Sequence, residues 1–347
     1  MMINWGIIGA GSIAKVFANG LRFSKTGQLT AIASRTPGKA DALADLFDVE
    51  KRYDSYEAIL ADDTVDAVYI STIHPAHLEP VEMAAKAGKH MLVEKPIAMN
   101  AAEAAKMVAA ARENDVFLME AFMYRCHPQI AKLVELIRDG AIGDVLVVRS
   151  TFGYHAGFNP DSRAYNRELG GGGILDVGCY PASMVRLVAG AASGKPFLDP
   201  VAFKATGVVG PTGVDHYTTA TLKFENDVVA EIATAVACNL PPDTVIYGST
   251  GILSVPNPWL PSSPCRSARE ALPLDTTFPS SKLVLHKRGA EPEEITIDVD
   301  RDLFSYEADM VGNHIANRQA PAMNWQDTLG NMQTLDRWLA ELGVAYA

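Results

Sequence analysis

Basic residues are scarce in this chain of 347 residues: 30 lysines and arginines stand against 41 aspartates and glutamates, and the formal net charge is −11. Such a surface repels nucleic-acid phosphates and anionic lipid headgroups, so neither a nucleic acid nor a membrane is expected as a partner. No stretch approaches the ~18 uninterrupted apolar residues of a membrane-spanning helix, and the start lacks the pattern of a secretory signal. We therefore expect a cytoplasmic protein that acts on small molecules.

Cysteine is also rare. The chain has four widely separated cysteines that form no C-x-x-C pair, namely Cys126, Cys179, Cys238 and Cys265. This spacing indicates neither a disulfide framework nor a zinc site, and no metal is expected. The length of the chain predicts about two domains.

What the sequence does contain is a glycine-rich turn near its start. An apolar run over residues 2–8, typical of a buried strand, leads into the segment Gly9 to Ala14 and a helix over roughly residues 12–24. Gly9 permits a tight turn, and Gly11 lets the backbone approach a pyrophosphate that faces the free N–H groups of the helix start. The pattern predicts a dinucleotide site; an ordinary strand-to-helix turn is the alternative.

Strands and helices alternate up to about residue 122. Short apolar runs at residues 29–34, 66–72, 90–93 and 116–119 predict parallel strands, and Asn100 to Glu103 form a capping box at the start of a helix. This pattern predicts a Rossmann-type, doubly wound α/β domain over residues 1–122. Ligands on such sheets bind beyond the carboxyl ends of the strands, so we expect the cofactor to contact Gly9, Gly11, Ser12, Ile13, Ser34, Arg35, Thr36, Thr72, His74, His77, Glu94 and Lys95.

The end of the second predicted strand bears on the choice of cofactor. NAD enzymes usually carry a carboxylate there for the ribose hydroxyls, but this strand ends in Ser34-Arg35-Thr36. A guanidinium beside hydroxyls suits a 2′-phosphate, so NADP(H) is preferred and NAD(H) is possible. The alternative is a surface arginine near a helix start.

Glu94-Lys95-Pro96 places a lysine at the end of another strand, directly before a proline. The Lys95-Pro96 bond is a candidate for the cis form, because X-Pro bonds have only a modest trans preference. This setting suits an ammonium aimed into the cleft, and an exposed lysine in an ordinary strand-to-loop turn is the equal alternative.

The second half of the chain, residues 123–347, has a different pattern. Its apolar and β-branched runs predict an α+β domain with a large, mainly antiparallel sheet, with strands over residues 145–151, 201–209, 218–224, 228–237, 245–253, 282–286 and 294–299. Asn226-Asp227 predicts a hairpin. Two amphipathic helices, near residues 304–317 and 325–342, are expected to pack on the core.

Two segments of this half bear on a site. The glycine run 170–173 enters a helix on which Asp176 and Tyr180, four residues apart, share one face. The loop of residues 256–264, with Trp259, is either a lid or a rigid connection.

Three motifs in this order resemble those of the glucose-fructose oxidoreductase, inositol dehydrogenase and rhizopine catabolism protein (Gfo/Idh/MocA) family. They are the segments 9–14, 87–96 and 171–178, and they span both halves of the chain. Residues 119–128 further resemble the branch of dimeric dihydrodiol dehydrogenases and NADP-dependent D-xylose dehydrogenases. That branch usually has tyrosine at the position of Tyr180, where many other members have histidine.

The resemblance implies an oxidoreductase that transfers a hydride between NADP(H) and the CH–OH or carbonyl group of a sugar, polyol or vicinal diol. Tyr180 is the candidate base for the hydroxyl proton. Lys95 is the cation that lowers the pKa of this tyrosine from its ordinary value of about 10, and Asp176 orients the substrate or the lysine. The converse assignment, in which Lys95 carries the proton and Tyr180 orients, stays open.

Further expectations concern the substrate, the assembly and other functions. Substrate contacts are expected from polar and aromatic side chains in the cleft: Arg125, Tyr154, Asn159 and Arg163. A homo-oligomer, dimer or tetramer, is expected on the outer face of the second sheet, because its apolar strands exceed what one helix layer buries and because the family tends to form oligomers. A cofactor-dependent glycoside hydrolase of the same family and a non-catalytic dinucleotide-sensing regulator are the alternative functions.

Overall fold

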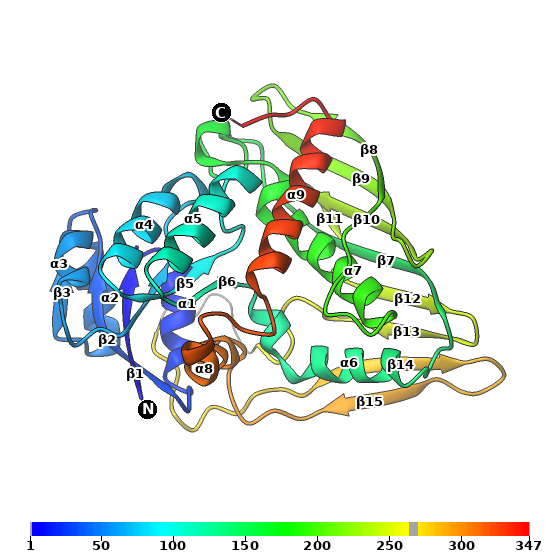
Figure 1. Cartoon of the computed structure of the whole chain (residues 1–347), viewed down its shortest axis with the longest axis horizontal. Helices are drawn as coiled ribbons and strands as arrows, with labels where there is room; N and C mark the ends of the chain where they lie inside the picture. Colours follow the sequence, from blue (N-terminus) through cyan, green and yellow to red (C-terminus); the bar gives the residue numbers. More distant parts are fainter. Residues whose placement is uncertain (1, 264–269, 347) are drawn as a thin grey trace.

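The computed structural model describes residues 2–263 and 270–346. A parallel sheet lies on one side of the molecule and a larger sheet on the other, and the helices α7 (Cys179–Ala191) and α9 (Trp325–Glu341) lie between them (Figure 1). Cys265 and Pro264 lie outside the described residues.

The first sheet has six parallel strands in the order β3-β2-β1-β4-β5-β6. Its strands are β1 (Ile3–Ile8), β2 (Gly27–Ala33), β3 (Lys51–Tyr53), β4 (Ala67–Ile70), β5 (His90–Glu94) and β6 (Leu118–Ala121). Its helices are α1 (Ser12–Leu21), α2 (Lys39–Phe47), α3 (Tyr56–Leu60), α4 (Leu78–Lys86) and α5 (Ala101–Glu113). The predicted Rossmann-type arrangement is confirmed. The division of the chain at residue 122 stays a prediction.

Local signals account for where these elements lie. Trp5, Ile7 and Ile8 of β1 are fully buried, as expected for a strand covered on both faces. Helix α5 begins at the predicted cap, where the Asn100 side chain accepts the N–H of Glu103 at 2.9 Å. Strand β3 was not predicted, because three residues are too few to show a period.

The second sheet has nine strands in the order β15-β14-β13-β12-β7-β10-β9-β8, with β11 paired to β7. They are β7 (Val145–His155), β8 (Ala202–Val209), β9 (Asp215–Lys223), β10 (Val229–Ala235), β11 (Ala237–Leu240), β12 (Thr244–Gly248), β13 (Gly251–Val255), β14 (Ser281–Lys287) and β15 (Glu293–Ile297). All pairings are antiparallel except that of β7 with β10, so the predicted sheet is confirmed.

One turn prediction and one strand prediction in this sheet had different outcomes. The hairpin at Asn226-Asp227 is confirmed, because β9 and β10 pair directly and Asp227 has a φ of 62°. The single strand expected over residues 245–253 is wrong. It is the antiparallel pair β12 and β13, and the segment between Gly248 and Gly251 turns back, with Ser249 and Thr250 bonded to Asp144 and Ile142.

One face of the second sheet is covered by helices, including α6 (Pro128–Arg138), α7 and α9 (Figure 1). The stretch Arg167–Ala191 is long and apolar enough to cross a membrane by composition, but its apolar window is buried entirely within the protein. The outward positions of β9 and β10 carry Tyr217, Thr219, Thr221, Glu231 and Ala233, which is a mixed rather than strongly apolar set. Helices α8 (Leu303–His314) and α9 confirm the predicted C-terminal pair.

Candidate active site

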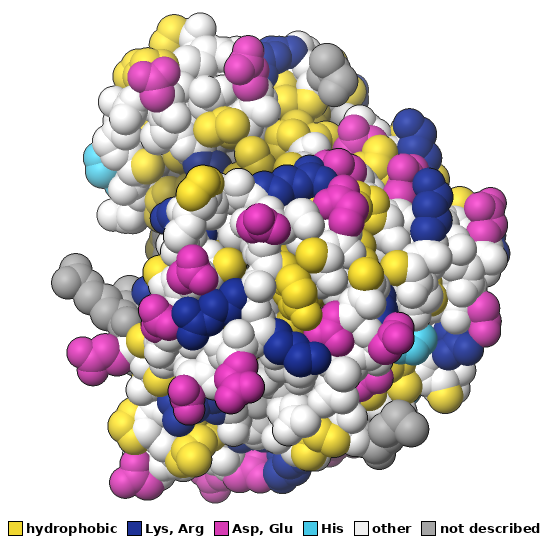
Figure 2. Space-filling model, turned by 90° about the vertical axis from the view of Figure 1, so that its left-hand side faces the viewer, with side chains coloured by type: hydrophobic (Ala, Val, Ile, Leu, Met, Phe, Trp, Pro, Cys, Tyr) yellow, Lys and Arg dark blue, Asp and Glu magenta, His cyan; other side chains and the backbone are white. Residues whose placement is uncertain are grey.

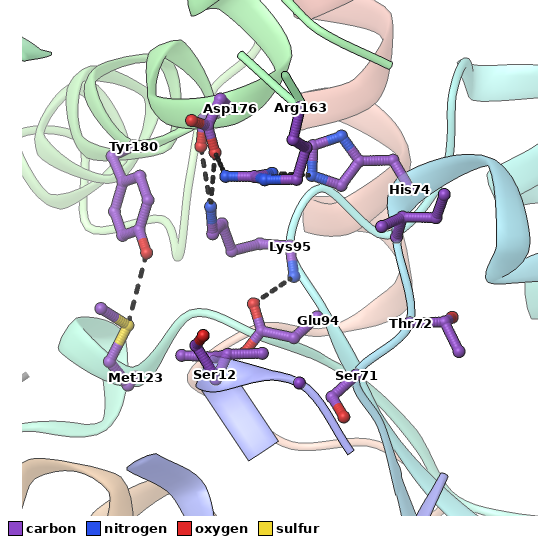
Figure 3. A pocket seen from close by; sticks show the side chains of 13 residues that line it. Ser12, Ser71, Thr72, His74, Glu94, Lys95, Met123, Arg163, Asp176 and Tyr180 are labelled. Atoms are coloured by element: carbon purple, nitrogen blue, oxygen red, sulfur yellow. Dashed lines mark hydrogen bonds and ion pairs between the residues drawn. The ribbon is translucent and has the colours of Figure 1, made fainter. Parts of the chain in front are cut away.

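A hollow of about 300 Å³ lies at the carboxyl ends of β1, β4 and β5, where the strand order of the parallel sheet reverses. Residues of the second half of the chain close it from the other side (Figure 3). The lining residues are Gly11, Ser12, Ile13, Ser71, Thr72, Ile73, His74, Glu94, Lys95, Met123, Arg163, Asp176 and Tyr180. The topological switch point of such a sheet is the usual place for a dinucleotide.

The glycine-rich turn fits a pyrophosphate. Gly9 has a φ of +94°, and a Cβ there would lie 3.1 Å from the backbone nitrogen of Thr72, so the turn requires glycine. A Cβ on Gly11 would meet nothing within 4 Å, so this glycine faces open space and lets a ligand reach the backbone. Helix α1 begins at Ser12 without a side-chain cap, which leaves its first N–H groups available for an anion.

Lys95 joins the two halves of the site. The bond to Pro96 is cis, as predicted. The Lys95 ammonium donates to the backbone carbonyl of Asp176 at 2.7 Å and lies 3.8 Å from Oδ1 of the same residue. It also lies 5.1 Å from the ring centroid of Tyr180. Because the side chains of Lys95 and Asp176 are only 8% and 6% exposed, this contact is shielded from water.

Asp176 provides the carboxylate that the cations of the hollow contact. Its Oδ1 accepts from Arg163 at 2.7 Å, and its Oδ2 accepts from the Tyr154 hydroxyl at 2.5 Å. Burial alone would raise the pKa of Asp176, but the positive charges of Lys95 and Arg163 hold it well below its usual range. Asp176 therefore stays ionised.

A π-helical turn precedes α7 and sets the direction of Asp176. Residues Ile174–Gly178 form this turn, so Asp176 and Tyr180 reach the hollow through a wider winding than the α-helix expected from their spacing. The N–H of Ile174 donates to buried Asp215 at 2.9 Å. Gly172 has a φ of +102°, and a Cβ there would lie 2.4 Å from the same carboxylate, so this position requires glycine.

Tyr180 lies in an aromatic wall and is 1% exposed. Its hydroxyl is 3.6 Å from Sδ of Met123, and its ring centroid lies 5.2 Å from that of Phe152 and 5.6 Å from that of Trp259. Trp259 is 1% exposed and donates from its ring nitrogen to the carbonyl of Thr151 at 3.0 Å. In its described part, the loop of residues 256–263 therefore packs Trp259 against the ring of Tyr180.

The two predicted histidines differ in position. His74 lines the hollow, with Nε2 3.4 Å from Arg163; burial and then the charge of Lys95 hold its pKa well below 6.5. His77 is fully buried, and its ring nitrogens lie 3.0 Å from the carbonyls of Thr72 and Ile97. His77 thus ties two loops together instead of lining the hollow.

Two predicted substrate residues are not in the hollow. Arg125 is buried outside the hollow, where it forms an ion pair of 2.6 Å with Asp327. The prediction that Arg125 lines the cleft is therefore wrong. Asn159 is exposed, and its side chain accepts the N–H of Asp161 at 3.0 Å. Arg163 lines the hollow, and Tyr154 reaches it through Asp176.

The predicted 2′-phosphate residues lie at the end of β2. The Ser34 hydroxyl accepts the N–H of Thr36 at 3.2 Å. The Arg35 guanidinium lies 4.0 Å from the ring centroid of Tyr56 and donates to both carboxylate oxygens of Glu79, at 2.8 and 3.0 Å. Sequence reasoning missed this pair, because Glu79 is 44 residues away along the chain.

Other contributors to the site were also missed. Ser71, Ile73 and Met123 line the hollow. Ile73 lies between the predicted Thr72 and His74, and so already belongs to the predicted rim at the end of this strand, whereas Ser71 directly precedes it. Met123 carries no comparable signal in the sequence.

A glycine cradle at the switch point of a Rossmann sheet, facing a buried lysine–carboxylate pair, defines an oxidoreductase that uses a nicotinamide dinucleotide. Residues 3–122 match the oxidoreductase family with an NAD-binding Rossmann fold (GFO/IDH/MocA), and residues 130–254 match the GFO/IDH/MocA C-terminal domain. The chain belongs to this family, and it is an NAD(P)-dependent dehydrogenase that acts on hydroxyl groups.

The similar proteins include dehydrogenases and sugar oxidoreductases. Trans-1,2-dihydrobenzene-1,2-diol dehydrogenase from Xenopus laevis is 34% identical over 351 residues, covering 100% of both chains. The Danio rerio enzyme of this name is 38% identical over 266 residues, 76% of this chain and 77% of the relative.

Solved structures share the fold over almost the whole chain. KijD10, a 3-ketoreductase from Actinomadura kijaniata in complex with NADP and TDP-benzene, has a TM-score of 0.82 at 25% identity and covers 99% of this chain and 98% of its own. Aldose-aldose oxidoreductase from Caulobacter crescentus has a TM-score of 0.83 at 23% identity, covers 98% of this chain and 97% of its own, and supports the fold.

Proposed function

We propose that this protein oxidises or reduces a sugar, polyol or vicinal diol, with dihydrodiols and D-xylose as leading candidates, and prefers NADP(H). The observation that carries the proposal is the contact of Lys95 with Asp176 beside Tyr180, directly next to the glycine cradle. Curated relatives named dihydrodiol dehydrogenases support the choice of substrate class.

Different residues of the hollow have different roles in such a reaction. The bound nicotinamide would take up or give the hydride. In oxidation, Tyr180 takes the proton of the substrate hydroxyl at its phenolic oxygen, and in reduction it returns that proton. The ammonium of Lys95 favours the tyrosinate, because a nearby cation stabilises the charged form.

Asp176 and its partners hold this pair in position. The carbonyl and carboxylate of Asp176 restrain Lys95, while Arg163 and Tyr154 fix the carboxylate. Arg163 is 46% exposed and presents further N–H donors to a hydroxylated substrate. The converse assignment, with Lys95 as the proton carrier, is the second candidate, because this ammonium also lines the hollow.

The cations around the glycine turn support the preference for NADP(H). Besides Arg35, the residues Lys15 and Lys39 line a neighbouring hollow of about 260 Å³ next to Gly11 and Ser12. No ion pair is found for either lysine within residues 2–263 and 270–346. Unpaired ammonium groups are suitable partners for phosphate.

A substrate panel tests the proposal. Purified protein is assayed with NADP+ and NAD+ against aldoses, polyols, cyclitols and dihydrodiols, following the absorbance of the reduced nicotinamide. Net reduction of NADP+ with a sugar or diol is expected. Hydrolysis of a glycoside without net cofactor turnover would instead identify the glycosidase alternative, and dinucleotide binding without any turnover would identify a regulator.

We also propose that the protein is a cytoplasmic homo-oligomer, a dimer or tetramer, that associates through the outer face of the second sheet. That face carries a hollow of about 370 Å³ lined by Val208, Tyr217 and Leu240 among others. Exposed Val208 and Tyr217, at 41% and 46%, are side chains that association would bury.

A further inference from the structure

The Arg35 guanidinium is held on two sides before any cofactor arrives. One face lies over the ring of Tyr56, with 4.0 Å from the guanidinium carbon to the ring centroid. Along one edge, both terminal nitrogens donate to the two carboxylate oxygens of Glu79. A second carboxylate, that of Glu57, lies 3.7 Å from the same guanidinium. The cation is therefore surrounded by more negative than positive charge.

Glu79 is close enough to Arg35 to influence the binding of any ligand group that contacts this arginine. It lies in the first turn of α4, a helix that begins just beyond the loop containing Thr72 and His74, which lines the cofactor hollow. The hydrogen bond and the charge of Glu79 raise the pKa of Arg35, and Arg35 in turn lowers that of Glu79, so both groups stay charged at neutral pH. Five N–H donors are present on a guanidinium, and Glu79 occupies two of them.

We infer that Glu79 is a specificity-determining residue that limits the preference for NADP(H) over NAD(H). This inference rests on the proposed role of Arg35 at the 2′-phosphate. A phosphate that binds Arg35 must either break the two hydrogen bonds between Arg35 and Glu79 or share the guanidinium with Glu79. In both cases the phosphate lies near the carboxylate of Glu79, which has the same sign of charge. NAD(H) carries an uncharged hydroxyl at that position, so it neither competes for the guanidinium as an anion nor is repelled by Glu79.

The pair is exposed enough for its effect to be moderate and dependent on salt. The side chains of Arg35 and Glu79 are 42% and 60% exposed. Removing the charge of Glu79 is therefore expected to tighten NADP+ binding by about three- to tenfold at low ionic strength and to leave NAD+ binding within about twofold. The gain in affinity for NADP+ should shrink as salt is added, because salt screens exposed charges.

The experiment compares dissociation constants of NADP+ and NAD+, measured by calorimetry, for the wild type, Glu79→Gln and the matched control Glu82→Gln. Glu82 lies on the same helix, and no ion pair involving it is found among the residues that the structure describes. Melting temperatures check that each variant folds. Tighter NADP+ binding only in Glu79→Gln supports the inference.

Three results would overturn this inference alone. They are unchanged NADP+ affinity, weaker NADP+ binding, which would make Glu79 a support that orients Arg35 for phosphate, and an equal gain in Glu82→Gln. A wild type that binds NAD+ more tightly than NADP+ would contradict the proposed cofactor preference alone, since the shift caused by Glu79→Gln is still measured. If neither dinucleotide binds any variant, both the proposed function and this inference are wrong.

Discussion

The ammonium of Lys95 donates a 2.7 Å hydrogen bond to the main-chain carbonyl of Asp176, a residue 81 positions later in the chain. This bond joins the end of β5 in the parallel sheet to the π-helical turn before α7. Because the acceptor is a backbone atom, no substitution at position 176 removes it directly. The position of Lys95 and the charge around it can therefore be tested separately.

Asp176→Asn removes the charge but keeps the backbone acceptor. We expect this variant to lose about 3 kcal/mol of unfolding free energy at pH 7, because the buried charge of Lys95 loses the carboxylate of Asp176. Tyr154→Phe removes one hydrogen bond to the same carboxylate and should cost about 1–2 kcal/mol. Urea unfolding measures both. Equal stability of Asp176→Asn and the wild type would show that the carboxylate does not hold the cations.

Arg35→Ala tests the cofactor preference from the cationic side. The variant should weaken NADP(H) binding by about 1.5–3 kcal/mol, which is typical of a hydrogen bond to a charged group, and should hardly change NAD(H) binding. Calorimetry with both dinucleotides measures the difference. Equal loss for the two cofactors would mean that Arg35 contacts the shared part of the molecule. A wild type that binds NADP(H) no more tightly than NAD(H) would refute the preference.

Much of the fold could be predicted, because its signals are local. The apolar runs of the parallel sheet, the glycine turn before Ser12 and the cap at Asn100 each act within a few residues, and each lies at or within a few residues of the element that the structure has. The same holds for Lys95, whose place follows from the end of a strand and the next proline. One strand was predicted where β12 and β13 form an antiparallel pair, because Ser249 and Thr250 were not recognised as a turn.

The errors at the site arise from partners that are distant in sequence. Arg125 has the residue type of a substrate contact, but Asp327, 202 positions away, holds it in the core. Likewise, the bidentate partner of Arg35 and the π-helical winding at Asp176 depend on packing between elements. Residue type and spacing predict which side chains are chemically able to act, whereas only the fold decides which of them are free to do so.

Association through the outer sheet face predicts a mass above that of one chain, 37.3 kDa, by light scattering at micromolar concentration. Tyr217→Glu should shift the protein toward the monomer, because Tyr217 is 46% exposed on that face and a charge would be costly to bury. Glu113→Gln, on helix α5 of the parallel domain, serves as the control. A wild type that is monomeric would refute the proposal.

Lys95→Met and Tyr180→Phe should each lower turnover by about 10² to 10⁴ and leave NADP(H) binding largely intact, because positioned acid–base groups contribute about that much. If Lys95 acts through Tyr180, the double variant should be little slower than either single one. Rates are followed against pH. The oxidation rate of the wild type should rise with pH as Tyr180 loses its proton, and this rise should disappear in Tyr180→Phe. Near wild-type turnover of that variant would show that Tyr180 does not carry the proton, and would leave Lys95 or a histidine such as His155 as the carrier.

Glu120→Gln should change how stability depends on pH. Glu120 is 1% exposed, and its Oε1 accepts the N–H of Ile97 at 3.0 Å. Burial raises the pKa of Glu120 from 4.5 to about 8, so between these values the folded protein holds a proton that the unfolded chain has lost. The contribution of Glu120 is therefore fully present below pH 4.5 and is lost as the pH rises toward 8.

The glutamine side chain keeps an oxygen for Ile97 and cannot ionise. Relative to the wild type, Glu120→Gln should gain about 2–4 kcal/mol of unfolding free energy between pH 5 and pH 9, since each pKa unit is worth about 1.4 kcal/mol. Urea unfolding at intervals of pH measures the two curves. Glu113→Gln removes an exposed carboxylate at the end of α5, so its curve of unfolding free energy against pH should run parallel to that of the wild type. A Glu120→Gln curve that is also parallel would show that Glu120 ionises in the folded state as readily as in the unfolded one.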